Sequence, residues 1–173
     1  MAQESPTVSP NPFRLILDRV RDASPADEAA VATEAVGETI PFMATVGAEV
    51  DVYTPSEVRV SLPDRPAMHN HVGTPHAAAL ALLAEAATGL VMAINLPDGA
   101  VPLLRTMNVD FRRMATGRVT ACATLSEDEQ ERIAARPIGK IAVDVELTSD
   151  AGSDTEDPST DAAVTGTLQW AWL

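Results

Sequence analysis

The sequence is short of cysteine and of aromatic residues. Its 173 residues include one cysteine, Cys122, with two tryptophans, one tyrosine and three phenylalanines. A single cysteine excludes an internal disulfide and a zinc site built on several cysteines. Apolar residues still make up 46% of the chain, so a sizeable core is expected. That core must be built from small and aliphatic side chains.

Positive charge is also scarce. Twelve basic residues stand against 25 acidic ones, for a net charge of -13. Nucleic acids and anionic membranes are bound by positive surfaces, so neither is expected as a partner. One segment departs from this balance, because Arg105, Arg112, Arg113 and Arg118 have only Asp110 as an acid among them. These arginines either bind a polyanionic small molecule or pair with the many surface acids.

No targeting segment is visible at the start of the chain. Residues 1–10 are polar and contain proline, which predicts a cytoplasmic protein. One apolar run, residues 75–96, has the length of a membrane span. However, Glu85 lies in its middle, where a lone acid is expensive in lipid. The run therefore predicts a buried core helix.

Hydrophobic periodicity divides the chain into a helical start and a mostly β remainder. Helices are predicted for residues 11–22, with Asn11 as N-cap, and for residues 25–36, with Gly37 as the stop. They form an N-terminal extension over residues 1–40. Apolar and polar residues then alternate, as in half-buried strands. The strand patterns cover residues 46–52, 58–62, 103–111, 119–125, 141–147 and 164–172.

These patterns predict an α+β domain over residues 41–173. Half-buried strands favour an antiparallel sheet with one covered face, and a helix that is apolar all round must be enclosed. We therefore expect a long central helix wrapped by a curved antiparallel sheet of about six strands. Residues 126–136 predict a short helix with a capping box, and residues 149–161 predict a solvated loop. In the third strand, one face is predicted to carry Leu103, Arg105, Met107, Val109 and Phe111.

The start of the long helix resembles the signature of hotdog-fold acyl-CoA thioesterases. Residues 70–85 contain a Gly-Thr-x-His step, a small pair after the histidine and an acid nine residues past it. Residues 108–113, followed by Gly117, are similar to the family's next strand and turn. The resemblance is to the phenylacetate-pathway type and its uncharacterised relatives. That family usually has two glycines where this chain has Ala77 and Ala78, and often an aspartate at the acid position.

The resemblance implies a bacterial enzyme that hydrolyses an acyl-CoA as a homodimer or a dimer of dimers. The acyl group is expected to be small or medium in size, aromatic acids included. Coenzyme A would be part of the substrate, and no separate cofactor or metal is expected. Arg112, Arg113 and Arg118 are the candidates for binding its phosphates.

Glu85 is the leading candidate for catalysis. A carboxylate within an apolar helix must be paired, hydrogen-bonded or protonated, and burial raises its pKa. As a functional group it is a general base or a nucleophile toward a thioester carbonyl. As a structural group it is a carboxylate satisfied by a neighbour such as Thr88, one turn on.

The N-terminus of the long helix offers the other half of a site. With Thr74 as N-cap and Pro75 as the first helical residue, the backbone N–H groups of His76, Ala77 and Ala78 lack helical partners. Such groups can hold a developing oxyanion.

A distance along the helix then predicts how many chains form the site. Ala77 and Glu85 are eight residues apart, which is roughly 12 Å along a helix. That is too far for both to act on one carbonyl group. If both are catalytic, they come from two chains, which predicts a homodimer.

Other interpretations remain open at this stage. Asn70 either holds the thioester or the attacking water, as the resemblance implies, or shapes a turn. The spacing of His71 and Glu85 is also similar to the acid–base pair of hotdog-fold 3-hydroxyacyl dehydratases. His69 and His71 lack a clear third ligand for a metal. A hotdog protein that binds acyl thioesters without turnover is the remaining alternative.

Overall fold

The computed structural model describes residues 8–150 and 162–173. Most of the predicted 149–161 loop lies outside these residues. The helices and strands follow one another in the order α1 (Pro12–Arg21), α2 (Glu28–Thr39), α3 (Pro41–Val46), β1 (Glu49–Tyr53), β2 (Glu57–Leu62), the 3₁₀ turn η1 (Pro66–Met68), α4 (Ala77–Ile94), β3 (Pro102–Phe111), β4 (Val119–Thr124), α5 (Glu127–Ala134), β5 (Gly139–Ser149) and β6 (Val164–Trp172).

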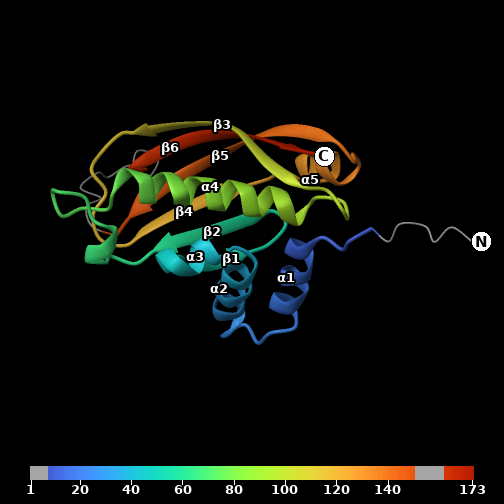
Figure 1. Cartoon of the computed structure of the whole chain (residues 1–173), viewed down its shortest axis with the longest axis horizontal. Helices are drawn as coiled ribbons and strands as arrows, with labels where there is room; N and C mark the ends of the chain where they lie inside the picture. The colour runs from blue at the N-terminus through green and yellow to red at the C-terminus, as the bar shows by residue number, and fades with distance from the viewer. Residues whose placement is uncertain (1–7, 151–161) are drawn as a thin grey trace, which may run out of the picture.

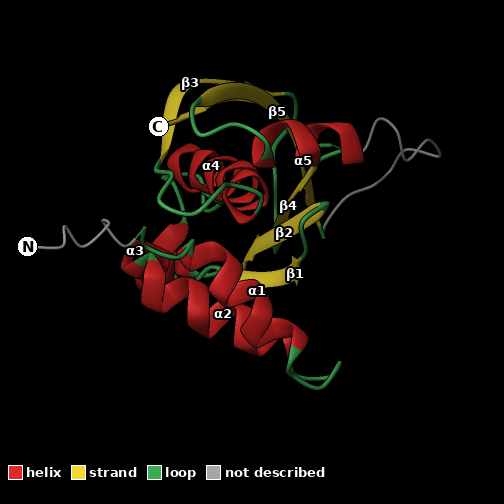
Figure 2. Ribbon diagram, turned by 90° about the vertical axis from the view of Figure 1, so that its right-hand side faces the viewer, coloured by secondary structure: helices red, strands yellow, loops and turns green. Residues whose placement is uncertain are grey.

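The six strands form one antiparallel sheet in the order β1-β2-β4-β5-β6-β3. The sheet curves around α4, which packs against β2, β3, β4, β5 and β6 (Figures 1 and 2). The predicted α+β architecture with a wrapped central helix is thereby confirmed. α4 is long and apolar enough to cross a membrane, but 61% of it is buried within the protein. Its apolar surface therefore serves the core.

Small residues on α4 let the sheet approach the helix closely. Ala84 and Ala87 are fully buried. Gly89 allows the indole of Trp170 on β6 to lie against the helix backbone, and the indole N–H donates to the Thr88 hydroxyl at 3.1 Å. The expectation of a core built from small side chains is thus met at the contact between helix and sheet.

Replacing Gly89 with alanine is expected to destabilise the fold by about 1–3 kcal/mol. The new Cβ would lie 2.8 Å from the Trp170 ring, which the bond to Thr88 holds in place. This overlap outweighs the helix propensity that favours alanine over glycine by about 1 kcal/mol. Urea unfolding followed by tryptophan fluorescence measures the effect. Gly37→Ala is the milder comparison, because its nearest neighbour would be 3.2 Å away; a more stable Gly89→Ala would contradict the prediction.

The N-terminal segment differs from its prediction in two places. α1 begins as expected, with Asn11 as its N-cap. α2 continues through Gly37, which was predicted to end it. A Cβ at this position would lie 3.2 Å from Ala44 of α3, so the glycine allows α2 and α3 to pack closely. The predicted strand at residues 46–52 starts later, because Pro41 opens the short helix α3 and Gly47 ends it with φ of 62°.

A β-bulge changes which residues of β3 share a face. The pairing with β6 shifts between Leu104 and Thr106, so that Arg105 is an extra residue. Leu104 pairs with the buried Trp170, and both therefore point toward α4. The predicted face that combined Leu103 and Arg105 with Met107 is wrong, because a strict period of two does not survive a bulge. β3 is also an edge strand.

Candidate active site

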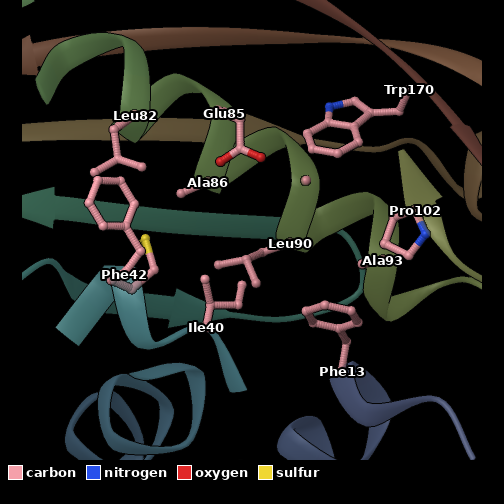
Figure 3. Close-up of a pocket in the computed structure, with 12 residues that line it drawn as sticks. Phe13, Ile40, Phe42, Leu82, Glu85, Ala86, Leu90, Ala93, Pro102 and Trp170 are labelled. Carbon is pink, nitrogen blue, oxygen red and sulfur yellow. The ribbon is translucent and has the colours of Figure 1, made fainter. Parts of the chain in front are cut away.

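Glu85 projects from the middle of α4 into an apolar cavity of about 190 Å³ (Figure 3). The side chain is partly buried, and it is the only ionisable group among the residues that line this cavity. The walls come from the N-terminal segment, from α4 itself, from the start of β3 and from Trp170 of β6. An acidic group therefore stands alone in an otherwise hydrocarbon surrounding.

Thr88 does not satisfy the Glu85 carboxylate, although it lies one helical turn away. Its hydroxyl donates to the carbonyl of Ala84 at 2.8 Å and accepts the hydrogen bond from Trp170. Burial raises the pKa of the Glu85 carboxyl, and no hydrogen bond or charge from the described residues opposes this shift. The structural interpretation in which Thr88 satisfies this carboxylate is therefore wrong. A carboxyl group with a raised pKa in a cavity is a candidate functional group.

This burial predicts a pH-dependent cost to the stability of the fold. The pKa of Glu85 in the folded state lies above the unfolded value of about 4.3, so the folded state binds the proton more tightly. This adds to the free energy of unfolding at pH values below about 4.3, and the added stability is lost as the pH rises through the raised pKa. We expect Glu85→Gln to unfold at a higher temperature than the parent near pH 8, with the difference shrinking toward about pH 4.

Thermal unfolding followed by circular dichroism checks the expected stabilisation. Glu131→Gln is the matched control, because Glu131 is exposed on α5 and undergoes the same chemical change. The control should show no such pH trend. A Glu85→Gln difference that is equal at both pH values would contradict the raised pKa.

The N-terminus of α4 is built differently from the prediction. The N-cap is His76, and the helix begins at Ala77. Pro75 forms an isolated β-bridge with His69, and the His76 N–H donates to the Met68 carbonyl at 2.8 Å, which holds both residues extended. Thr74 and Pro75 are therefore not the cap and the first helical residue.

Only one of the three predicted oxyanion donors is left available. The His76 N–H is used by Met68, and the Ala78 N–H donates to Nδ1 of His76 at 3.0 Å. Among the described residues, the N–H of Ala77 has no hydrogen-bond partner, and Ala77 is exposed. Of the three predicted donors, the geometry thus leaves the Ala77 N–H as the candidate.

The loop before α4 is organised by Asn70. Its Oδ1 accepts from the N–H groups of Val72 at 2.9 Å and Thr74 at 3.3 Å, and its Nδ2 donates to the Thr74 hydroxyl at 2.9 Å. These bonds agree with the interpretation of Asn70 as a turn residue. His71 is exposed at the tip of this loop. The described part of the chain contains no group of three potential metal ligands, and His69 pairs with Asp64 at 2.5 Å.

The predicted arginines lie at the far end of β3 from the Glu85 cavity. Pro102, at the start of β3, lines the cavity, and Arg112 follows the strand's end roughly 30 Å away at about 3.4 Å per residue. β3 ends at the end of the molecule where α4 begins (Figure 1). Arg112 and Arg113 therefore lie toward the helix end that carries Ala77, and not beside Glu85 of the same chain.

Arg118 is already engaged by carboxylates. Its guanidinium pairs with Glu49 at 2.7 Å and with Asp51 at 2.9 Å, and it contacts the Ser61 hydroxyl. For Arg118, these ion pairs agree with the alternative interpretation, in which arginines pair with surface acids. Arg112 is exposed and donates to the Thr165 hydroxyl at 2.8 Å.

Sequence reasoning missed the part of the cavity wall that comes from the N-terminal segment. Phe13 of α1, Ile40 at the N-cap of α3, and Phe42 and Met43 of α3 all line it. Two of the chain's three phenylalanines are among them. The scarcity of aromatic residues was the available signal, but nothing local in the sequence places them beside α4.

Comparison with known proteins identifies the fold. The chain matches the family model described as "Domain of unknown function (DUF4442)" over residues 29–160. No curated protein matches it. Protein PA5026 from Pseudomonas aeruginosa, of unknown function and described as a probable thioesterase, is 22% identical with a TM-score of 0.69, covering 83% of this chain and 93% of that one.

Two further solved structures are named as thioesterases. A thioesterase family protein from Silicibacter pomeroyi is 20% identical with a TM-score of 0.64, covering 91% of this chain and 98% of that one. Thioesterase HI1161 from Haemophilus influenzae is 15% identical with a TM-score of 0.63, covering 82% and 90%. At these identities the likeness shows the common fold, and it confirms the predicted hotdog architecture.

Proposed function

The chain belongs to the family described as a domain of unknown function, DUF4442, and from this premise and its hotdog fold we propose that it hydrolyses acyl thioesters. Glu85 is the proposed general base. The observation that carries the proposal is a carboxylate that has no hydrogen-bond or ion-pair partner among the described residues and faces an apolar cavity, where burial raises its pKa. A general base is most effective when its pKa approaches the working pH, and burial moves Glu85 in that direction.

The proposed reaction needs one water molecule and no cofactor. Glu85 takes a proton from the water as the water oxygen bonds to the thioester carbonyl carbon. The carbonyl oxygen becomes an oxyanion, which the Ala77 N–H stabilises. The C–S bond breaks as the C=O bond re-forms, and the proton passes from Glu85 to the departing sulfur. The products are a carboxylic acid and a thiol.

The proposed site combines two chains. Ala77 and Glu85 of one chain are roughly 12 Å apart along α4, so they cannot serve the same carbonyl group. Two antiparallel copies of α4 across a two-fold axis would bring Ala77 of one chain to Glu85 of its partner.

The edge of the sheet supports a homodimer independently of the chemistry. β3 is ten residues long, and one of its edges is free of any neighbouring strand among those described. Leu103, Leu104 and Phe111 on β3 are exposed. A long apolar edge strand is an association site unless it is covered, and a second β3 related by the two-fold axis would cover it.

Coenzyme A is the proposed carrier of the acyl group. Arg112 and Arg113 lie toward the α4 end that carries Ala77, so in the dimer they belong to the same composite site as the oxyanion donor. They would hold the phosphates by charge-assisted hydrogen bonds. Because salt screens the attraction between these arginines and the phosphates, this local docking should weaken with added salt.

Release of free thiol from a panel of acyl-CoAs tests the proposal. The panel should span short, medium and aromatic acyl groups, and the thiol is followed with a chromogenic disulfide. Turnover above the uncatalysed rate supports the hydrolase. Tight binding of every member without thiol release would support an acyl-thioester-binding protein instead.

A further inference from the structure

The N-terminal segment forms one wall of the cavity beyond Glu85. Glu85, Gly89 and Ala93 follow one another at intervals of four residues, so they lie along one face of α4 and line the cavity in turn. Phe13 of α1 lies at the Ala93 end, opposite the carboxylate (Figure 3). Glu85 and Phe13 thus lie toward different ends of the cavity, with Phe42 beside Leu82 on the side away from Phe13 (Figure 3).

Phe13 is held at this position by hydrogen bonds around it. The side chain of Asn11 accepts from the Phe13 N–H at 2.9 Å and donates to the carbonyls of Ala93 at 2.8 Å and Leu96 at 2.9 Å. Asn11 is 5% exposed, and its side chain forms hydrogen bonds with free backbone groups at the start of α1 and at the end of α4. From the other side, the Tyr53 hydroxyl donates to the Phe13 carbonyl at 3.0 Å.

The dimensions of the cavity indicate the class of ligand. Glu85 and Ala93 are eight residues apart, so this length is roughly 12 Å. An extended chain covers roughly 1.2 Å per bond, since a residue of three bonds spans at most about 3.6 Å. A volume of about 190 Å³ is below the range of about 300–1,000 Å³ typical of drug-sized ligands. This space suits one slender hydrocarbon chain.

We propose that the cavity takes the acyl chain of the substrate and that Phe13 sets its length, with an optimum on the order of eight to ten carbons. The inference rests on the proposed thioesterase activity, with the carbonyl group at Glu85 and the tail directed to Phe13. The α1–α3 segment is then part of the specificity site and not only a covering of the sheet.

The first arm of the test measures kcat/KM for saturated acyl-CoAs from butanoyl to tetradecanoyl. In the parent, each methylene added up to the optimum should raise kcat/KM by about fourfold, the change that burial of one CH₂ gives, and longer chains should fall off. Phe13→Ala should move the optimum longer by on the order of two to four carbons, about the reach of the ring. Phe13→Trp should move it shorter.

Leu15→Ala is the matched control for this arm. Leu15 lies on the same helix, is 52% exposed and does not line the cavity, so its truncation should leave the optimum unmoved. Circular dichroism of each variant separates a change of specificity from a loss of fold. An optimum that stays in place in both folded Phe13 variants would overturn the inference while leaving the hydrolase intact.

The second arm does not depend on turnover. Trp170 lines the cavity, so its fluorescence reports occupancy by free fatty acids of increasing length. Parent protein should bind the medium-length acids best, and Phe13→Ala should extend the range to longer ones. Length-dependent binding without any thiol release would retain the assignment of Phe13 and overturn the proposed hydrolysis. Absence of both binding and turnover would overturn both.

Discussion

Glu85→Gln is expected to lower kcat for acyl-CoA hydrolysis by about 10²- to 10⁴-fold, the contribution typical of a positioned general base. Glutamine has nearly the shape of glutamate but cannot take a proton from water. Direct attack by the carboxylate on the carbonyl carbon would be lost as well, because an amide is a poor nucleophile. The variant should fold, since it replaces a buried charge with a neutral group.

Thiol release at saturating substrate measures this effect. Glu131→Gln, the exposed counterpart on α5, should retain the parent rate, and KM of Glu85→Gln should change little because the cavity keeps its shape. A folded Glu85→Gln enzyme that turns over as fast as the parent would remove Glu85 from the mechanism.

A heterodimer of two inactive chains is expected to regain about half of the parent activity. One chain carries Glu85→Gln and the other carries Ala77→Pro. If the site joins Glu85 of one chain to the Ala77 N–H of its partner, one of the two sites in the heterodimer keeps both groups. Each homodimer lacks one group at both sites. Loss of a single oxyanion donor alone is expected to cost about 10²- to 10³-fold in kcat.

Ala77→Pro removes the N–H without breaking α4. Ala77 is the first residue of the helix, where proline is tolerated because the N–H has no intrahelical partner. His76 before it is extended, with φ of -67° and ψ of 139°, which is the conformation that a residue preceding proline prefers. Ala77→Gly is the matched control, because it keeps the N–H and should keep the activity.

The heterodimer experiment uses two affinity tags and two-step purification, followed by thiol release per dimer. Recovery to about half of the parent rate supports the composite site. A heterodimer as inactive as both homodimers would mean that Glu85 and Ala77 do not meet across the interface. A monomer with full activity in the parent would contradict the two-chain site outright.

Much of the fold was already predictable from local patterns. Alternating apolar residues located the strands, and the enclosed helix followed from an apolar run that needed burial on all sides. Glu85 was found because a carboxylate in such a run is chemically out of place. Asn11 was found because a helix start needs an acceptor for its free N–H groups. Each of these signals is encoded within a few residues.

The prediction failed where pairing across a loop or between two strands decides the outcome. The start of α4 moved to Ala77 because Pro75 pairs with His69 and His76 bonds to Met68. The predicted set of residues on one face of β3 was wrong across Arg105, because the pairing with β6 contains a bulge. Neither partner can be identified from the spacing of apolar residues alone.

The sequence by itself determined an α+β chain with one isolated acid in its central helix, because periodicity and burial act locally. Only the tertiary structure decided what that acid faces. Asn11 meets Ala93 from 82 residues away and holds Phe13 at the end of the Glu85 cavity. Such a contact depends on how whole elements pack, and packing is specified by the shape of the complete core and not by any short stretch of residues.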